Sequence, residues 1–254
     1  MRLTSVILSS LLAGLTLLSP YTHAAVPANI AAAIADANRP EADKQLDADR
    51  KPAQTLEFAG VKSGQSVAEL IPGGGYFTRL LSKAVGPKGH LYAWAPQPPG
   101  EAETKRDFAA AAKAIAADPH YSNVTVLQTG LSTAFAGNPQ DLVFTAQNYH
   151  DLHNVKEVDL AVFNKAVFDA LKPGGIYVVL DHSAEKGSGV RDTSTLHRID
   201  EATVKSEVMA AGFEYVGRSG VLANAADPRT AKVFDPAIRH KTDQFILKFR
   251  KPKK

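Results

Sequence analysis

The sequence of 254 residues predicts an α/β fold with a mostly parallel sheet that is covered by helices on both faces. Two observations predict it. Short apolar runs typical of strands alternate with longer segments in which apolar residues recur at helical spacing. A turn of three glycines, Gly73-Gly74-Gly75, joins the first such strand to the first such helix, where the backbone must turn sharply. Strands that are separated by helices of this length imply right-handed crossovers and a parallel sheet.

The N-terminal residues 1–24 have the pattern of a secretory signal peptide. Met1-Arg2 provides a positive start, residues 3–18 are apolar, and Thr22-His23-Ala24 offers small residues at the expected cleavage position. Because the apolar run is shorter than the roughly 20 residues of a membrane span, we expect cleavage after Ala24 and a periplasmic or secreted mature protein. An uncleaved anchor is the alternative. We expect no membrane span after cleavage.

The rest of the chain is predicted to form a helical lead-in, residues 25–60, and one domain, residues 61–254. The acidic run that ends at Asp49 is predicted to be mobile. The absence of cysteine excludes disulfides, thiolate metal sites and cysteine nucleophiles. The formal net charge of +3 is too small to indicate a nucleic-acid partner. Nothing in the pattern indicates an oligomeric state.

The first strand and helix frame the expected binding site. Residues 67–71 are apolar except for Glu69 and are bounded by turn residues, as in a strand that is buried on both faces. The following helix is predicted from one apolar stripe, which consists of Phe77, Leu80, Leu81, Ala84 and Val85. Gly86-Pro87 ends this helix. Free N–H groups at the start of this helix favour a polar or anionic ligand group. We therefore expect a ligand at the C-terminal end of the first strand.

The remaining elements follow in alternation. The predicted strands are residues 90–94, 123–127, 142–145, 176–180, 213–216 and 244–249, and the predicted helices are residues 103–117, 158–170 and 200–211. Phe108 and Val162 are expected to face inward from the first two of these helices, and Asp200 is expected to cap the third. The long connection at residues 224–242 fits either an ordered functional loop or a flexible flap.

Residues 67–75, Val-Ala-Glu-Leu-Ile-Pro-Gly-Gly-Gly, resemble the first motif of class I S-adenosylmethionine-dependent methyltransferases. The turn is most similar to that of the exported predicted methyltransferases, which carry Pro-Gly-Gly-Gly followed by an aromatic residue. The resemblance implies a Rossmann-like, seven-stranded sheet with an antiparallel last strand, and S-adenosylmethionine as cofactor. It also implies that one set of residues holds the methionine end of the cofactor: Glu69, Pro72, Gly73, Gly74, Gly75 and Tyr76.

Two strand ends depart from the family. The family usually places an acid that binds ribose after the second strand, where this chain has Trp94 or Ala95, and many members have another acid after the third strand, where this chain has Gln128. Trp94 is instead predicted to stack on adenine. These departures leave open a second function, a non-catalytic exported small-molecule-binding protein on a degenerate methyltransferase scaffold. The predicted function is methyl transfer from S-adenosylmethionine to an unidentified small-molecule acceptor.

The segment after the fourth strand, residues 146–153, resembles the family's fourth motif, where residues beside the transferred methyl group lie. Asn148 is accordingly predicted to contact the cofactor, and Tyr149 and His150 the reacting groups. An imidazole near its usual pKa of about 6.5 suits proton removal from an acceptor, so His150 is the first candidate base and His182, after the fifth strand, the second. In relatives, a segment similar to residues 196–200 enters a helix near the acceptor pocket.

A set of potential metal ligands occupies the same predicted edge: His150, Asp151, His153, Asp181 and His182. No H-x-x-x-H or H-E-x-x-H spacing places two of them on one helix face. We therefore predict no metal site, and a metal centre stays the less favoured interpretation of these residues.

Overall fold

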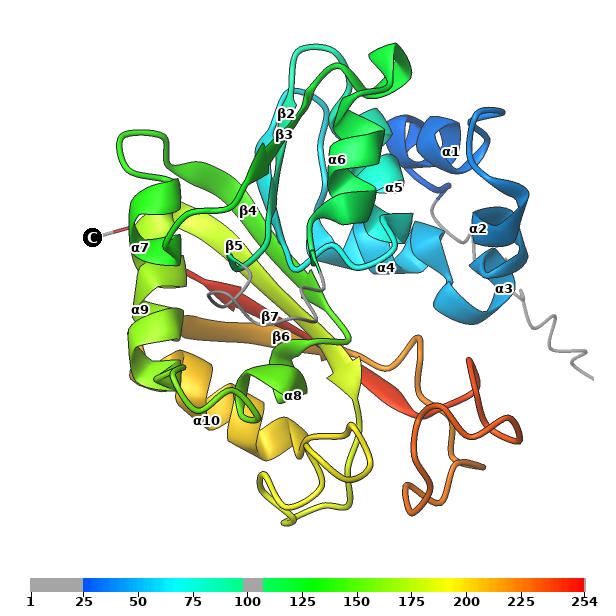
Figure 1. The fold of residues 1–254 in the computed structure, drawn as a ribbon, viewed down its shortest axis with the longest axis vertical. Helices are drawn as coiled ribbons and strands as arrows, with labels where there is room; N and C mark the ends of the chain where they lie inside the picture. The colour runs from blue at the N-terminus through cyan, green and yellow to red at the C-terminus, as the bar shows by residue number, and fades with distance from the viewer. Residues whose placement is uncertain (1–24, 98–106, 254) are drawn as a thin grey trace, which may run out of the picture.

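The computed structural model describes residues 25–97 and 107–253, and the predicted signal peptide lies outside them. Its core is a seven-stranded sheet in the order β3-β2-β1-β4-β5-β7-β6 (Figure 1). The strands are β1 (Ser66–Leu70), β2 (His90–Trp94), β3 (Val124–Leu127), β4 (Gln140–Ala146), β5 (Leu171–His182), β6 (Glu214–Ser219) and β7 (Gln244–Arg250). The first five strands pair in parallel, whereas β7 runs antiparallel to both β5 and β6. The predicted fold class is confirmed.

The strand order places the switch point of the sheet between β1 and β4. The chain builds outward from β1 through β2 to β3 and then returns to β4 on the other side of β1. The connections that leave β1 and β4 at their carboxyl ends therefore part in opposite directions. In open α/β sheets, ligands bind in the crevice that this arrangement leaves.

Helices cover both faces of the sheet (Figure 1). The α-helices are α1 (Ala28–Ile34), α2 (Glu41–Gln45), α3 (Asp47–Arg50), α4 (Pro52–Ala59), α5 (Tyr76–Val85), α6 (Ala110–Ala116), α7 (Leu131–Ala134), α8 (Tyr149–Leu152), α9 (Leu160–Ala170) and α10 (Glu201–Ala210). One buried core includes side chains of α1, α4, α5 and α6, and the other those of α7, α9 and α10. None of the described helices is long and apolar enough to cross a membrane.

Two residues that were predicted to face the core are exposed. Val162 is 63% exposed, because α9 turns Phe163, Ala166 and Val167 to the sheet instead. Phe108 is 38% exposed and precedes α6, which begins only at Ala110. The apolar stripe of α5 is buried as predicted, and Asp200 caps α10 by accepting a hydrogen bond from the backbone of Ala202.

The lead-in is ordered where the sequence predicted a mobile run. Arg39 Nη2 lies 2.6 Å from Asp47 Oδ1, and the Tyr76 hydroxyl donates to the same oxygen at 2.7 Å. Arg79 Nη1 pairs with Asp43 at 3.0 Å. Because Tyr76 and Arg79 belong to α5, these contacts fix α2 and α3 beside the start of α5, next to the glycine turn.

Candidate functional site

The glycine turn that follows β1 leaves room for a ligand. Gly73 and Gly74 are exposed, and within residues 25–97 and 107–253 no atom lies within 4 Å of the position that a Cβ would occupy on either. Gly75 differs, because a Cβ there would lie 2.3 Å from Cδ1 of Ile115. Pro72 is buried and its carbonyl accepts a hydrogen bond from the Gly75 amide at 3.0 Å. Gly75 therefore permits helix packing, whereas Gly73 and Gly74 face open space.

Glu69 lies inside the sheet near the end of β1. Its side chain is buried, and the Thr78 hydroxyl of α5 donates to Oε2 at 2.6 Å. Burial raises the pKa of Glu69 to about 8, although the Thr78 hydrogen bond and the charge of Arg79 oppose the rise. Glu69 therefore holds a proton at neutral pH and joins β1 to α5.

The aromatic residues beside the turn have other partners. Tyr76 faces the lead-in, where it binds Asp47, and the Arg50 guanidinium lies 4.5 Å from its ring centroid. Trp94 is buried, donates from Nε1 to the Thr129 carbonyl at 2.9 Å and packs edge-on against Phe163. The structure gives Trp94 a packing role in the core, which does not match the predicted stacking on adenine.

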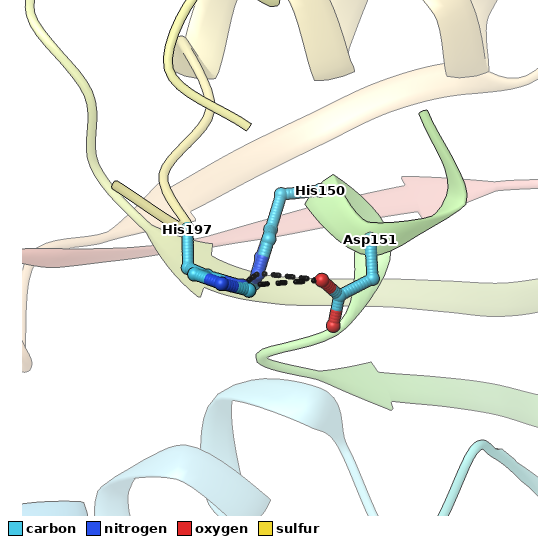
Figure 2. A group of neighbouring side chains, drawn as sticks. All are labelled: His150, Asp151 and His197. Carbon is cyan, nitrogen blue, oxygen red and sulfur yellow. Dashed lines mark hydrogen bonds and ion pairs between the residues drawn. The ribbon is translucent and has the colours of Figure 1, made fainter. Parts of the chain in front are cut away.

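A polar cluster forms where β4 and β5 end. His150 and Asp151 belong to α8, directly after β4, and His197 comes from the loop between β5 and α10. Figure 2 shows that the three side chains point toward one another. His150 is almost fully buried, whereas the side chains of Asp151 and His197 are 50% and 31% exposed. The cluster is thus open to solvent on one side.

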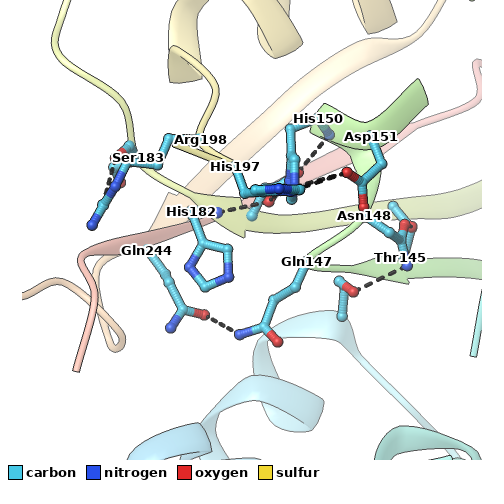
Figure 3. Close-up of polar contacts among 12 residues, drawn as sticks. Thr145, Gln147, Asn148, His150, Asp151, His182, Ser183, His197, Arg198 and Gln244 are labelled. Atoms are coloured by element: carbon cyan, nitrogen blue, oxygen red, sulfur yellow. Dashed lines mark hydrogen bonds and ion pairs between the residues drawn. The ribbon is translucent and has the colours of Figure 1, made fainter. Parts of the chain in front are cut away.

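Asn148 ties this cluster to the glycine turn. Its Nδ2 donates to the carbonyls of Leu70 and Ile71, at the end of β1, at 3.3 and 3.0 Å. Its Oδ1 accepts a hydrogen bond from the hydroxyl of Thr145 on β4 (Figure 3). The polar atoms of the Asn148 side chain are therefore bonded within the protein, and the residue holds the ends of β1 and β4 together.

Asp181, at the end of β5, fixes the orientation of His150. The backbone and Nδ1 of His150 both donate to its carboxylate at 2.8 Å, and the His182 backbone donates at 2.7 Å. Burial disfavours the charged form of His150, but the carboxylates of Asp181 and Asp151 outweigh it and raise its pKa to about 10. His150 is therefore a poor proton acceptor at neutral pH, contrary to its predicted role as the first candidate base.

His182 differs from His150 in charge. Its Nδ1 lies 2.8 Å from the Thr242 hydroxyl, and Figure 3 shows its ring between Gln147 and Gln244. Loss of solvation lowers the pKa of His182 to about 4, and the neighbouring His150 and Arg198 act in the same direction against Asp181. His182 is therefore the neutral imidazole of the two.

Tyr149 and His153 point away from the cluster. The Tyr149 hydroxyl donates to Glu207 at 2.9 Å and accepts from Asn164 Nδ2 at 2.8 Å, in the core against α9 and α10. His153 Nε2 lies 3.2 Å from the same Glu207. The structure corrects two sequence interpretations, because Tyr149 lies apart from the candidate catalytic groups and His153 apart from the other potential metal ligands.

His197 and Arg198 lie in a segment that the resemblance placed near the acceptor pocket, but the sequence analysis gave neither residue a role. Arg198 is fully buried, pairs with Asp227 at 2.8 Å and donates to the Ser183 carbonyl at 3.0 Å. These bonds fix the loop that carries His197 and order the connection at residues 224–242. The signals in the sequence were the position of His-Arg directly before the helix cap Asp200 and the similarity of residues 196–200 to a helix-entry segment near the acceptor pocket of relatives.

Backbone strain marks the same edge. Ile71, Gln147 and His197 have positive φ values of 54°, 60° and 56°. Non-glycine residues rarely adopt this conformation, and a β-branched residue such as Ile71 is a clear exception. Strain of this kind is retained where the surrounding structure enforces it, most often at functional sites. Ile71 follows β1, Gln147 follows β4, and His197 belongs to the polar cluster.

No protein-family model matches the chain. Among curated proteins, it is similar to the ubiquinone/menaquinone biosynthesis C-methyltransferase UbiE of Legionella pneumophila strains Lens and Paris. Identity to each is 30% over 146 residues, which cover 54% of this chain and 50% of the relative. The chain thus matches about half the length of these curated relatives.

Solved structures share the fold at lower identity. A S-adenosylmethionine-dependent methyltransferase from Aquifex aeolicus has a TM-score of 0.56 at 21% identity, covering 84% of this chain and 98% of the other. The cyclase SpnF has a TM-score of 0.59 at 20% identity, covering 85% of both chains. Because these proteins are named for different reactions, the fold alone does not determine the reaction. The chain has the Rossmann-like fold that S-adenosylmethionine-dependent methyltransferases share.

Proposed function

We propose that this protein transfers a methyl group from S-adenosylmethionine to a small-molecule acceptor. The observation that carries the proposal is the open space in front of Gly73 and Gly74, at the carboxyl end of β1 and at the switch point of the sheet. A side chain at either glycine would fill this space. The 30% identity to curated methyltransferases supports the same interpretation.

The charges beside the turn suit this cofactor, which carries a carboxylate, an ammonium group and a sulfonium group. Arg50 is partly buried over the ring of Tyr76, and among the described residues no carboxylate forms an ion pair with it. Loss of solvation lowers the pKa of Arg50. Its guanidinium is therefore available to bind the cofactor's carboxylate, together with backbone N–H groups of the glycine turn.

S-adenosylmethionine supplies a methyl group bonded to a positively charged sulfur. When bound, the cofactor would supply this methyl group to the acceptor's nucleophilic atom, and sulfur would keep the pair of electrons of the broken carbon–sulfur bond. Of the two histidines, His182 would be the group that takes the proton lost by the acceptor, because its imidazole is neutral whereas that of His150 already carries a proton; the pKa of about 4 makes His182 a weak base. Asn148 positions the ends of β1 and β4, and so holds the two halves of the site in register.

Calorimetric titration of S-adenosylmethionine and of its demethylated product tests the proposal. We expect micromolar binding of either, about −8 kcal/mol, that Gly74→Val abolishes because valine fills the open space. Gly217→Val is the matched control, since a Cβ on Gly217 of β6 also meets no atom of the described part of the chain within 4 Å but lies away from the site. Absence of binding by both ligands contradicts the proposal and favours the non-catalytic binding protein on the same fold.

We also propose that residues 1–24 are removed as a signal peptide and that the mature protein is periplasmic or secreted. The positive start and the short apolar run support this interpretation. N-terminal sequencing of the protein recovered from the periplasm or medium should begin at Ala25. Recovery with an intact N-terminus from the membrane fraction identifies an uncleaved anchor instead.

A further inference from the structure

Three potential ligand atoms form a nearly equilateral triangle at the open side of the polar cluster. Asp151 Oδ1 lies 3.3 Å from His150 Nε2 and 3.3 Å from His197 Nδ1. The two histidine nitrogens lie 3.4 Å apart (Figure 2). The three residues come from α8 and from a loop that follows β5, so the fold rather than a local motif assembles them.

The size of this triangle suits a tetrahedral ion with short bonds. A tetrahedral zinc ion with bonds of about 2.05 Å separates its ligand atoms by about 3.3 Å. An octahedral ion with bonds of the same length, as magnesium has, requires about 2.9 Å between neighbouring ligands. The observed distances of 3.3 and 3.4 Å therefore suit a tetrahedral ion without movement of the side chains.

The residues around the triangle fix the orientation of its side chains. Asp181, which is fully buried, accepts the Nδ1–H of His150 at 2.8 Å and so turns Nε2 toward the triangle. A carboxylate in this position is the usual partner of a metal-binding histidine, because it fixes the tautomer and the ring orientation. Arg198 anchors the loop of His197 through its buried pair with Asp227. The ligands are thus held before an ion binds.

We propose that His150, Asp151 and His197 bind a divalent transition-metal ion, with zinc the best fit, and leave one coordination position open. Two imidazoles and a carboxylate are ligands that zinc accepts, and three protein ligands with an open fourth position are typical of catalytic zinc. The partial exposure of Asp151 and His197 places that position on the solvent side. An ion there acts as a Lewis acid toward an oxygen or nitrogen that reaches it.

The test is a titration of Zn²⁺ alone, without S-adenosylmethionine, into the full-length protein after chelator treatment, in competition with a chromophoric chelator. We expect one ion per chain. His197→Ala should weaken binding by more than about 100-fold, beyond the roughly 10- to 100-fold lost when only a residue that orients a ligand is removed. His240→Ala, at an exposed histidine, is the matched control and should bind as the wild type does. Co²⁺ should give the intense visible absorption of a tetrahedral site.

Much less than one ion per chain, or equal affinity of His197→Ala and the wild type, overturns the proposal. Asp151→Asn provides a second variant at a half-exposed side chain, so the test does not depend on the folding of a variant at buried His150. The inference is independent of the proposed methyl transfer. Calorimetry of S-adenosylmethionine on chelator-treated protein reports on the cofactor site alone, so failure of one proposal can be distinguished from failure of the other.

Discussion

Replacement of Glu69 by glutamine should change how the stability of this protein depends on pH. Burial raises the pKa of Glu69 from 4.5 to about 8 in the folded protein. Because the folded state then binds a proton that the unfolded state releases, its contribution to stability is fully present below about pH 4.5 and is lost as the pH rises through 8. The difference between the two pKa values corresponds to about 5 kcal/mol, an upper limit that local relaxation will reduce.

Urea unfolding at a series of pH values measures this effect. From pH 4.5 to pH 8.5, the free energy of unfolding of the wild type should fall by several kcal/mol relative to Glu69→Gln, up to the limit of about 5 kcal/mol. The amide keeps an acceptor for the Thr78 hydroxyl, so the variant removes the titration and retains the hydrogen bond. Glu57→Gln, at an exposed position on α4, is the control and should follow the wild type. A difference between wild type and Glu69→Gln that stays constant over this range refutes the reasoning.

Two further variants test the residues around the cluster. Asp227→Ala should lower the free energy of unfolding, measured in urea, by about 3–5 kcal/mol, because it leaves Arg198 as an uncompensated buried charge. A loss below about 1 kcal/mol, the value of a surface ion pair, contradicts a structural role for this pair. Tyr149→Phe should cost about 1–3 kcal/mol, since Asn164 loses its acceptor and Glu207 its donor, while S-adenosylmethionine affinity by calorimetry stays at the wild-type value. A large loss of S-adenosylmethionine affinity in Tyr149→Phe would show that Tyr149 belongs to the binding site.

The parts of the fold that were predictable are those with local causes. The strand–turn–helix unit around Gly73-Gly74-Gly75 combines apolar runs with glycines, and its residues lie within one window of sequence. The cap at Asp200 depends on backbone groups two residues away. By contrast, Asp47 lies 29 residues from Tyr76, so the order of the lead-in depends on contacts that no local pattern contains.

The site was predicted in position but only partly in composition. The ends of the predicted strands indicated which segments meet, because the carboxyl ends of parallel strands lie at the same edge of the sheet. They did not give side-chain directions on α8, a helix of one turn, where His150 faces the cluster and Tyr149 the core. His197 was missed as a ligand because its place depends on the buried Arg198, which lies far in sequence from its partner Asp227.

The two sides of the switch point are suited to different tasks. The β1 side offers open space at Gly73 and Gly74 and a cation at Arg50, which are features for binding. The side formed by β4 and β5 places titratable groups around one carboxylate, Asp181, that receives hydrogen bonds from both His150 and His182. Positive charge at His150, whether carried by a proton or by a bound ion, disfavours a second charge on His182 and keeps it neutral. Asp181 thus allows one histidine to hold charge while the other stays neutral.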